Sequence, residues 1–355
     1  MTSNRLPDEP IAPMLAKIAD AIPDEAGFQF EPKWDGFRAL AFRRDAALTL
    51  QSRDLKPLER YFPELEGALR AQLPPGCILD GEIVIATPRG LDFDALQQRL
   101  HPAASRVRRL STETPASYVA FDVLAVEGES TMALPQAERR VLLEALLVDA
   151  APPLHLTPVT FDRAEAVRWL AEFEGAGLDG VVAKLESAAY QPGRRAMLKI
   201  KHARSADCVV AGFRWYKDRT DAVGSLLLGL YDDAGVLHHA GVTATFSMAV
   251  RHELLHTLAP LREVSPQAHP WLGPGGADDE RAPVAESRWS RGKDLGWIAL
   301  RPELVCEVRY DHLQGVRFRH ATTFMRWRPD KPARDCRYDQ LEVTAPFELA
   351  RVFWA

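Results

Sequence analysis

A lysine near the N-terminus carries the strongest chemical signal in the sequence. It stands in residues 31–38, which read EPKWDGFR, so Lys33 is followed by an Asp-Gly pair and by Arg38. A lysine amine is a nucleophile only when it is deprotonated, which requires a desolvated or electropositive setting. The attack of this amine on the α-phosphate of a nucleotide would give a phosphoramidate. Gly36 would let the backbone come close to the nucleotide, and Arg38 could bind the nucleotide. The alternative is a solvated lysine beside a surface turn.

Two further positions could serve such a reaction from strand-like segments. Glu82 lies in the apolar run 78–85, where a buried carboxylate is costly without a partner. A structural salt bridge would satisfy it equally well. Phe121 lies in the β-rich run 118–126, and on physical grounds alone an aromatic residue in a strand belongs to a core.

Lys199 and Lys201 alternate along the chain, so in a strand both point to one face. Two ammonium groups on one face can neutralise a phosphate and favour the neutral form of a neighbouring amine. An amphipathic edge strand is the alternative. Residues 317–337 add six Arg and one Lys against two Asp, which indicates either contact with a nucleic-acid backbone or a solvated charged surface.

The elements that must position these residues change in character near residue 203. Before it, apolar residues at helical spacing alternate with short β-rich runs. After it, strand-like runs with few helices predict a small closed β-barrel, at residues 208–213, 225–231, 236–245 and 305–310. Residues 264–288, rich in Pro, Gly and charge, are predicted to form a loop of this second domain. The apolar C-terminal residues, Phe347, Leu349, Val352, Phe353 and Trp354, are expected to pack on the barrel.

Bulk properties agree with two domains. The chain has 355 residues and a formal net charge of −5, so any nucleic-acid surface must be a local basic face. The four cysteines have no metal-ligand spacing, which favours reduced structural thiols. Because no leader or membrane-spanning run stands out, we expect a cytoplasmic protein.

Seven short segments together resemble the covalent nucleotidyltransferases, the superfamily of ATP-dependent DNA ligases, RNA ligases and mRNA capping enzymes. They match that family's motifs, in the family's order, over nearly the whole chain. They are residues 33–38 (KWDGFR), 52–54 (SRD), 79–84 (LDGEIV), 120–124 (AFDVL), 178–184 (LDGVVAK), 197–201 (MLKIK) and 326–331 (RWRPDK). Within this family, the short chain and the residues of the motifs at 178–184 and 326–331 most resemble those of the small bacterial C-type ATP-dependent DNA ligases.

The resemblance implies a role for each matching residue around the nucleotide. Lys33 would become adenylated, the main chain of Glu31 would read the adenine edge, and Phe121 would stack on the base. Arg38 and Arg53 would contact ribose and phosphate, and later the 5′-phosphate of DNA.

The remaining charged residues would serve the phosphates and a metal. Glu82 would bind the ribose hydroxyl or a metal ion. Asp179 would be the other metal ligand, although it departs from the glutamate that many family members carry, which leaves its coordination shell open. Lys199 and Lys201 would contact the α-phosphate. Arg328 and Lys331 would orient the departing pyrophosphate, whereas the sequence does not say which of Arg194 and Arg195 touches the nucleotide.

The resemblance also implies an α+β fold. A nucleotidyltransferase (adenylation) domain of antiparallel sheets and helices would span residues 1–202, followed by a small OB-fold β-barrel domain over residues 203–355. The expected activity is that of an ATP-dependent DNA ligase in DNA repair, with ATP and Mg²⁺ (or Mn²⁺), which carboxylate ligands favour. The expected partner is nicked duplex DNA, with repair proteins as candidates. We expect a monomer associated with the bacterial nucleoid and not with membranes.

Two classes of alternative remain at this stage. An RNA ligase or a GTP-dependent capping enzyme would share the first five motifs. A non-catalytic module that binds DNA nicks would keep the fold without the reaction, although the intact set of Lys33, Glu82, Lys199 and Lys201 argues against it.

Overall fold

A computed structural model of the chain has two compact units, which are described separately. It describes residues 10–352 except 89, 203, 218, 264, 266–268, 273–281, 284–295, 312 and 342–346. The first unit comprises Met1–His202 with Thr344–Ala355, and the second comprises Ala203–Val343. In the described part of the chain, no helix is long and apolar enough to cross a membrane.

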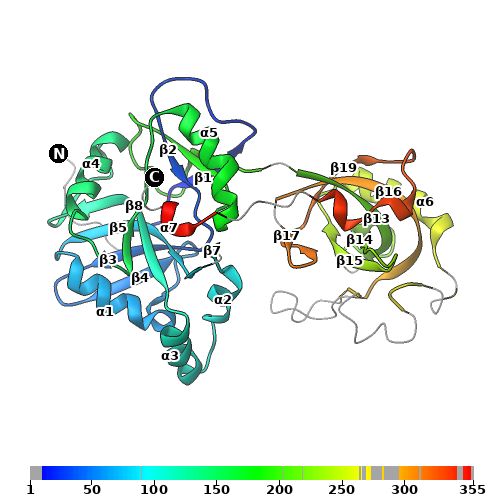
Figure 1. Ribbon diagram of the computed structural model, residues 1–355, viewed down its shortest axis with the longest axis horizontal. Helices are drawn as coiled ribbons and strands as arrows, with labels where there is room; N and C mark the ends of the chain where they lie inside the picture. The colour runs from blue at the N-terminus through cyan, green and yellow to red at the C-terminus, as the bar shows by residue number, and fades with distance from the viewer. Residues whose placement is uncertain are drawn as a thin grey trace. The chain divides into compact units, whose positions relative to one another are not determined.

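Two sheets form the first unit (Figure 1). One has the order β1-β12-β11-β2, and the other has the order β10-β8-β5-β3-β4 with β9 paired to β8. Pairing is antiparallel except for β1 with β12 and β10 with β8, which are parallel. The strands are β1 (Leu15–Ala19), β2 (Phe28–Pro32), β3 (Phe37–Arg43), β4 (Leu48–Ser52), β5 (Cys77–Val84), β8 (Ser117–Val126), β9 (Glu129–Ser130), β10 (Leu154–Leu156), β11 (Val181–Leu185) and β12 (Arg195–Ile200), with a separate hairpin β6 (Ala86–Thr87) and β7 (Gly90–Leu91).

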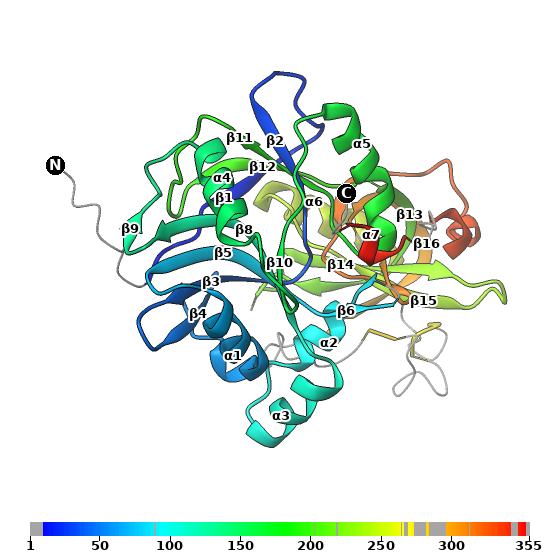
Figure 2. The same ribbon diagram turned by 60° about the vertical axis from the view of Figure 1, so that its left-hand side comes forward.

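Helices cover the outer faces of both sheets (Figure 2). Their bounds are α1 (Pro63–Gln72), α2 (Phe93–Gln98), α3 (Ala104–Glu113), α4 (Gln136–Leu146) and α5 (Arg163–Glu172), with 3₁₀ turns η1 (Glu59–Tyr61) and η2 (Phe173–Ala176). Helix α1 begins with Pro63 and has two acidic residues in its first turn, both favourable at a helix start. Its Leu65 and Leu69, four residues apart, are fully buried on one face.

Alternation along the strands divides the apolar residues among three cores. Ala39 and Ala41 of β3 pack toward α1, whereas Leu40 and Phe42 point to the opposite face and pack with Met197 of β12. The latter cluster therefore lies between the two sheets. A third cluster joins the other face of the β12-β11-β2 sheet to α5 and η2. The space between the sheets is the one to which the side chains of Arg38, Asp80 and Glu82 also point.

The C-terminal segment does not pack on the barrel as expected. In helix α7 (Leu349–Val352), Leu349 and Val352 are buried in the same cluster as Trp169 and Phe173 of the first unit. The ring of Phe347 lies 5.3 Å from that of Phe173. The expected domain boundary of 203–355 is therefore wrong at its C-terminal end, because these apolar side chains find their partners on α5 and η2; Phe353 and Trp354 lie outside the described residues.

The second unit is a closed five-stranded barrel. Its strands are β13 (Arg204–Trp215), β14 (Val223–Tyr231), β15 (Leu237–Thr243), β16 (Ile298–Tyr310) and β19 (Thr323–Trp327), in the order β15-β14-β13-β16-β19. A parallel bridge between Thr243 and Thr322 joins the two edge strands and closes the sheet. The elements outside the barrel are α6 (Met248–Leu258), the hairpin β17 (Leu313–Gln314) and β18 (Arg317–Phe318), and the turns η3 (Ala259–Leu261), η5 (Ala333–Asp335) and η6 (Tyr338–Gln340).

These observations confirm the fold class of an α+β domain followed by a small β-barrel. Most of the predicted loop 264–288 lies outside the described residues. Its Trp271, however, is almost completely buried in the barrel core, so this part of the segment is packed structure. All four cysteines are buried free thiols.

Candidate active site

Lys33 follows the end of β2, where long-range backbone contacts fix its position. The Lys33 amide donates to the carbonyl of Gly180 at 2.8 Å, and the Asp179 amide donates to the carbonyl of Lys33 at 2.9 Å. The indole of Trp34 is buried and donates to Thr157 Oγ1 at 2.8 Å. A side chain at Gly36 would collide with the Ile83 carbonyl of β5, so only glycine allows the turn to run against this strand.

The ammonium groups of Lys33 and Lys201 both contact the carboxylate of Asp179. Lys33 Nζ lies 2.5 Å from Asp179 Oδ2, and Lys201 Nζ lies 2.8 Å from the same oxygen. Asp179 thus joins two motifs that are distant in sequence. Burial alone would raise the pKa of Asp179, but the two ammonium groups outweigh it and hold that pKa below its usual value.

Lys199, on β12, adds a third amine near Lys33 and Lys201. Partial burial and the positive charges of Lys201 and Lys33 lower the pKa of Lys199 from its usual value. Gly180 has a φ of +130°, and a side chain there would collide with the carbonyl of Ile200. The close approach of β11 and β12 that brings Asp179 to Lys201 therefore requires glycine at this position. Three amines around one carboxylate can accept a phosphate anion.

The opposing sheet contributes Arg38, Glu82 and Phe121. Arg38 forms a two-pronged ion pair with Asp80, at 2.9 Å from Nε to Oδ1 and 2.5 Å from Nη2 to Oδ2. Its guanidinium carbon lies 5.2 Å from the centre of the Phe121 ring. Glu82, opposite Arg38 in the β3–β5 register, faces the same space. Burial raises the pKa of Glu82 to about 8, although Lys33 and Arg38 lower it.

Glu31 and Lys184 form a buried ion pair at 2.8 Å beneath these residues. Lys184 also donates to the carbonyl of Phe121 at 2.8 Å, and its ammonium lies 4.9 Å from that ring. The amide and carbonyl of Phe30 both form hydrogen bonds with Thr160, on one side of β2. Because successive residues of a strand turn these groups to opposite sides, the amide and carbonyl of Glu31 face β11. The Glu31 carbonyl already faces β11 with one lone pair. If this carbonyl also accepts a hydrogen bond from the edge of the base, it must do so with its second lone pair.

Arg53 is exposed in the turn after β4, and Ser52 is paired with Ala39 of β3. Arg53 therefore lies at the same end of the sheet as Arg38. The expected site residues Glu31, Lys33, Arg38, Arg53, Glu82, Phe121, Asp179, Lys199 and Lys201 all belong to the first unit.

Arg328 and Lys331 belong to the second unit, where both are anchored to Asp207. Arg328 Nη1 lies 2.9 Å from Asp207 Oδ1, and Lys331 Nζ lies 3.0 Å from Asp207 Oδ2. Asp330 also pairs with Arg328, at 2.8 Å. Asp207, which is mostly buried on β13, therefore orders both cations of the last motif.

The carboxylates that could hold a metal are Asp179, which contacts Lys33, and Glu82, whose pKa the charge of Lys33 lowers. Among the described residues, no three His, Cys, Asp or Glu side chains cluster as a metal site. Mg²⁺ is commonly bound by one or two carboxylates together with substrate phosphates and water, and this pair fits that mode.

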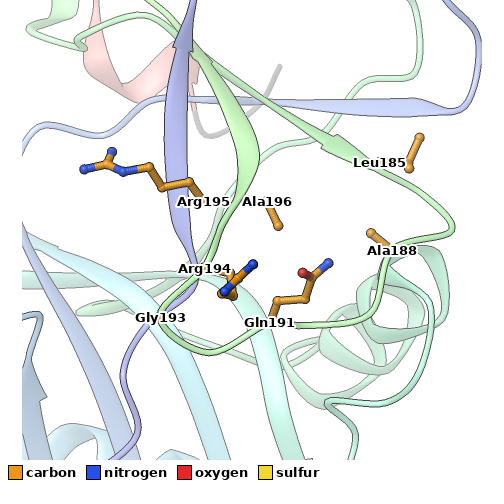
Figure 3. Close-up of a pocket in the computed structure, with 7 residues that line it drawn as sticks. All are labelled: Leu185, Ala188, Gln191, Gly193, Arg194, Arg195 and Ala196. Carbon is orange, nitrogen blue, oxygen red and sulfur yellow. The ribbon is translucent and has the colours of Figure 1, made fainter.

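A surface pocket of about 650 Å³ lies at the turn between β11 and β12, apart from Lys33. Arg194 and Gln191 lie side by side there, whereas Arg195 extends away from them (Figure 3). The guanidinium of Arg195 donates to the carbonyl of Ala16 on β1 at 3.0 Å.

Several residues that organise the site were not identified from the sequence. Asp80 and Asp122 stand inside the quoted motifs, next to Gly81 and Phe121, so their place in these motifs was a usable signal. Thr157, Tyr190 and Asp207 lie outside those motifs, and nothing local in the sequence distinguishes them.

Comparisons with known proteins agree with this geometry. The family model described as "ATP dependent DNA ligase domain" matches residues 13–201, and that described as "ATP dependent DNA ligase C terminal region" matches residues 219–331. The chain is 53% identical to DNA ligase C of Mycobacterium tuberculosis over 349 residues, which cover 97% of both chains. It is 52% identical to DNA ligase C2 of Mycolicibacterium smegmatis over 94% of both.

Two solved structures share the fold at low sequence identity. The structure described as "Pmar-Lig_PreS3" has a TM-score of 0.60 at 19% identity, covering 90% of this chain and 68% of that one. A structure from the Lig E DNA ligases has a TM-score of 0.55 at 17% identity, covering 90% of this chain and all of that one.

Proposed function

The chain belongs to the ATP-dependent DNA ligases, and we propose that Lys33 is the residue its reaction adenylates. The protein is a DNA ligase that uses ATP to seal nicks, in keeping with DNA repair. The observation that carries the assignment of Lys33 is its direct contact with Asp179, which also holds Lys201. A nucleophile, a carboxylate and a second ammonium group thus meet at one point between the two sheets.

In the first step, Lys33 Nζ attacks the α-phosphate of ATP. The new Nζ–P bond replaces the bond between that phosphorus and the oxygen of pyrophosphate, which leaves, and the amine loses a proton. Lys199 and Lys201 stabilise the negative charge on the α-phosphate. Asp179 holds Lys33 and Lys201 at the position where the phosphate must bind, so the phosphate replaces part of this contact.

The two later steps use the same centre. The 5′-phosphate of the nick attacks the adenylate and regenerates Lys33, giving DNA with an AMP cap. The 3′-hydroxyl then attacks the capped phosphate and expels AMP, which forms the phosphodiester bond. Arg38 and Arg53 are suited to these phosphates because a guanidinium binds phosphate oxygens in pairs.

We propose roles toward the nucleotide for residues of each unit. Phe121 would stack on the base, and Glu31 would contribute its carbonyl and its ion pair with Lys184. Arg328 and Lys331 would orient the pyrophosphate, with Asp207 fixing both side chains. The first unit would then be the adenylation domain and the barrel the OB-fold domain, with the C-terminal residues 347–352 belonging to the former.

Glu82 and Asp179 would hold Mg²⁺ or Mn²⁺. A divalent cation at this position supplies neutralisation of phosphate charge. Glu82 has to ionise for this role, and its high pKa makes ionisation easier at mildly alkaline pH than at neutral pH. We also infer that the enzyme acts as a cytoplasmic, nucleoid-associated monomer on nicked duplex DNA, with repair proteins as partners.

The assignment of Lys33 is tested with α-labelled ATP and Mg²⁺. Wild-type protein, first stripped of bound AMP with pyrophosphate, should retain label after denaturation, whereas Lys33→Ala should retain none. Lys56→Ala, at an exposed turn position, is the matched control and should label normally. Retention of label by Lys33→Ala would refute the assignment. Competition by GTP, and nicked duplexes with RNA on either side, would separate capping and RNA-sealing activities from DNA ligation.

A further inference from the structure

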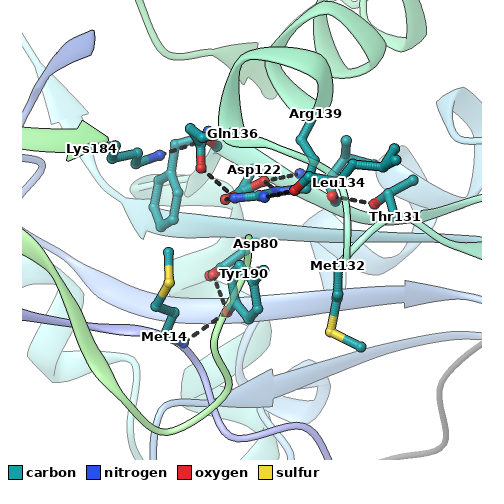
Figure 4. A network of polar contacts seen from close by, with 12 residues as sticks. Met14, Asp80, Asp122, Thr131, Met132, Leu134, Gln136, Arg139, Lys184 and Tyr190 are labelled. Carbon is teal, nitrogen blue, oxygen red and sulfur yellow. Dashed lines mark hydrogen bonds and ion pairs between the residues drawn. The ribbon is translucent and has the colours of Figure 1, made fainter. Parts of the chain in front are cut away.

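The hydroxyl of Tyr190 belongs to a buried polar network, in which it lies between Asp80 and Met14 (Figure 4). It donates to Asp80 Oδ2 at 2.7 Å and accepts from the amide of Met14 at 2.9 Å. Only about 4% of Tyr190 is exposed, so these two partners satisfy a hydroxyl that has little access to water. Tyr190 lies within the turn between β11 and β12 described above, far in sequence from both partners.

Asp80 connects this hydroxyl to Arg38. Asp80 is fully buried and takes three donors, namely Arg38 Nε, Arg38 Nη2 and the Tyr190 hydroxyl. The last two share the oxygen Oδ2. A buried carboxylate is stable only when it is paired and hydrogen-bonded, so each donor constrains where the carboxylate plane lies. The plane of Asp80 in turn sets the orientation of the Arg38 guanidinium, because two parallel N–H donors must match two oxygens.

The aromatic ring of Tyr190 touches a second buried ion pair. The guanidinium carbon of Arg139 lies 5.7 Å from the ring centre. Arg139 binds Asp122 with both Nε and Nη2, at 2.8 and 3.0 Å. Asp122 directly follows Phe121, and Arg38 lies over the Phe121 ring. Tyr190 therefore packs between the two ion pairs that flank this aromatic side chain.

We propose that Tyr190 is a positioning residue for lysine adenylation, which acts by fixing Asp80 and, through it, the guanidinium of Arg38. The inference rests on the proposed contact of Arg38 with the nucleotide. Without the hydroxyl, Arg38 is the side chain that remains bonded to Asp80 among the residues that the structure describes, and the two can tilt together. The guanidinium is then less well ordered for binding phosphate, although the ion pair itself persists.

The test compares Tyr190→Phe with a matched control, Tyr118→Phe. Tyr118 is also fully buried, and its hydroxyl donates to the carbonyls of Ala39 and Leu79 on the same two strands. It does not bond Asp80. Both variants lose one buried hydroxyl with its hydrogen bonds, so a purely structural role would affect them alike. Single-turnover lysyl-AMP formation is measured over a range of ATP concentrations at 15 °C, with near-UV circular dichroism to check folding.

Tyr190→Phe should slow adenylation or weaken ATP binding by about five- to tenfold, which lies within the range for the loss of one ordinary hydrogen bond. Tyr118→Phe should change either quantity by less than about twofold. In an Arg38→Ala background, Tyr190→Phe should have no further effect, because the residue it positions is gone. Equal effects of the two Phe variants, or an undiminished effect in the Arg38→Ala background, would overturn the proposal.

A second measurement does not depend on turnover. The Nε–H proton of Arg38 should give a slowly exchanging NMR signal in the wild type and in Tyr118→Phe, and should exchange faster in Tyr190→Phe. Unchanged exchange in Tyr190→Phe would also overturn the proposal. If wild-type protein formed no lysyl-AMP, the proposed function itself would fail, which is a different outcome from an active wild type with an equally active Tyr190→Phe.

Discussion

Replacing Glu82 by glutamine should stabilise the protein at alkaline pH while it removes most of the activity. Glutamine has nearly the same shape as the carboxyl group but cannot ionise. In the folded protein, burial raises the pKa of Glu82 from 4.5 to about 8. Between these two values the unfolded chain releases the proton of Glu82 while the folded chain keeps it. The folded state therefore loses stability as pH rises through this window.

The size of the effect follows from the two pKa values. A pKa difference of one corresponds to about 1.4 kcal/mol, which gives an unscreened loss of about 3 kcal/mol between pH 5.5 and pH 8.5. Because the Glu82 side chain is only half-buried, solvent screening reduces this to about 2 kcal/mol. For a unit of this size that is about 4–8 °C in Tm. Glu82→Gln should avoid this loss.

The assay is thermal unfolding of wild type and Glu82→Gln without metal at pH 5.5, 7 and 8.5. The Tm of the variant minus that of the wild type should grow with pH. Glu66→Gln, which alters an exposed helical carboxylate paired with Arg70, serves as the control and should show no such growth. Adding Mg²⁺ at pH 8.5 should narrow the difference if Glu82 is a metal ligand, since the metal favours the ionised form. A difference that stays constant with pH, or a wild type more stable at pH 8.5, would refute the reasoning about burial.

Two further predictions concern the second unit and the C-terminus. Asp207→Asn weakens the ion pairs that hold Arg328 and Lys331. The rate of lysyl-AMP formation should therefore fall about tenfold, while the rate of sealing of pre-adenylated nicked DNA should change much less. Equal slowing of both steps would contradict the role of these residues toward pyrophosphate. Phe347→Ala removes a ring packed on Phe173, which should lower the stability of the first unit by about 1–2 kcal/mol. Hydrogen exchange should then quicken around η2 and not in the barrel strands, and the reverse pattern would place the tail on the barrel.

Local patterns predicted the secondary structure well where short-range rules apply. Apolar residues at helical spacing before residue 203 predicted helices, and α1 is one of them, with Leu65 and Leu69 on its buried face. The strand-like runs after residue 203 predicted β13, β14, β15 and β16, whereas β19 was not among them. Helix α6 was not predicted either, since it packs on β14 with a weakly amphipathic sequence. The sequence also could not show on which domain the C-terminal apolar residues pack, because that depends on which apolar surface is left uncovered in the folded chain.

The sequence by itself identified the candidate reactive groups and their order along the chain. Residue type and strand alternation, both of which are local, singled out Lys33, Lys199 and Lys201, and the order of the family's motifs gave them and Glu82 their proposed roles. Tertiary structure decided which charges meet. Asp179 reaches Lys33 across 146 positions, Lys184 reaches Glu31 across 153, and Arg328 reaches Asp207 across 121. Such pairs depend on the register of the sheets and on the close packing of strands at Gly36 and Gly180. Neither the register nor this packing can be predicted from a short segment of the sequence.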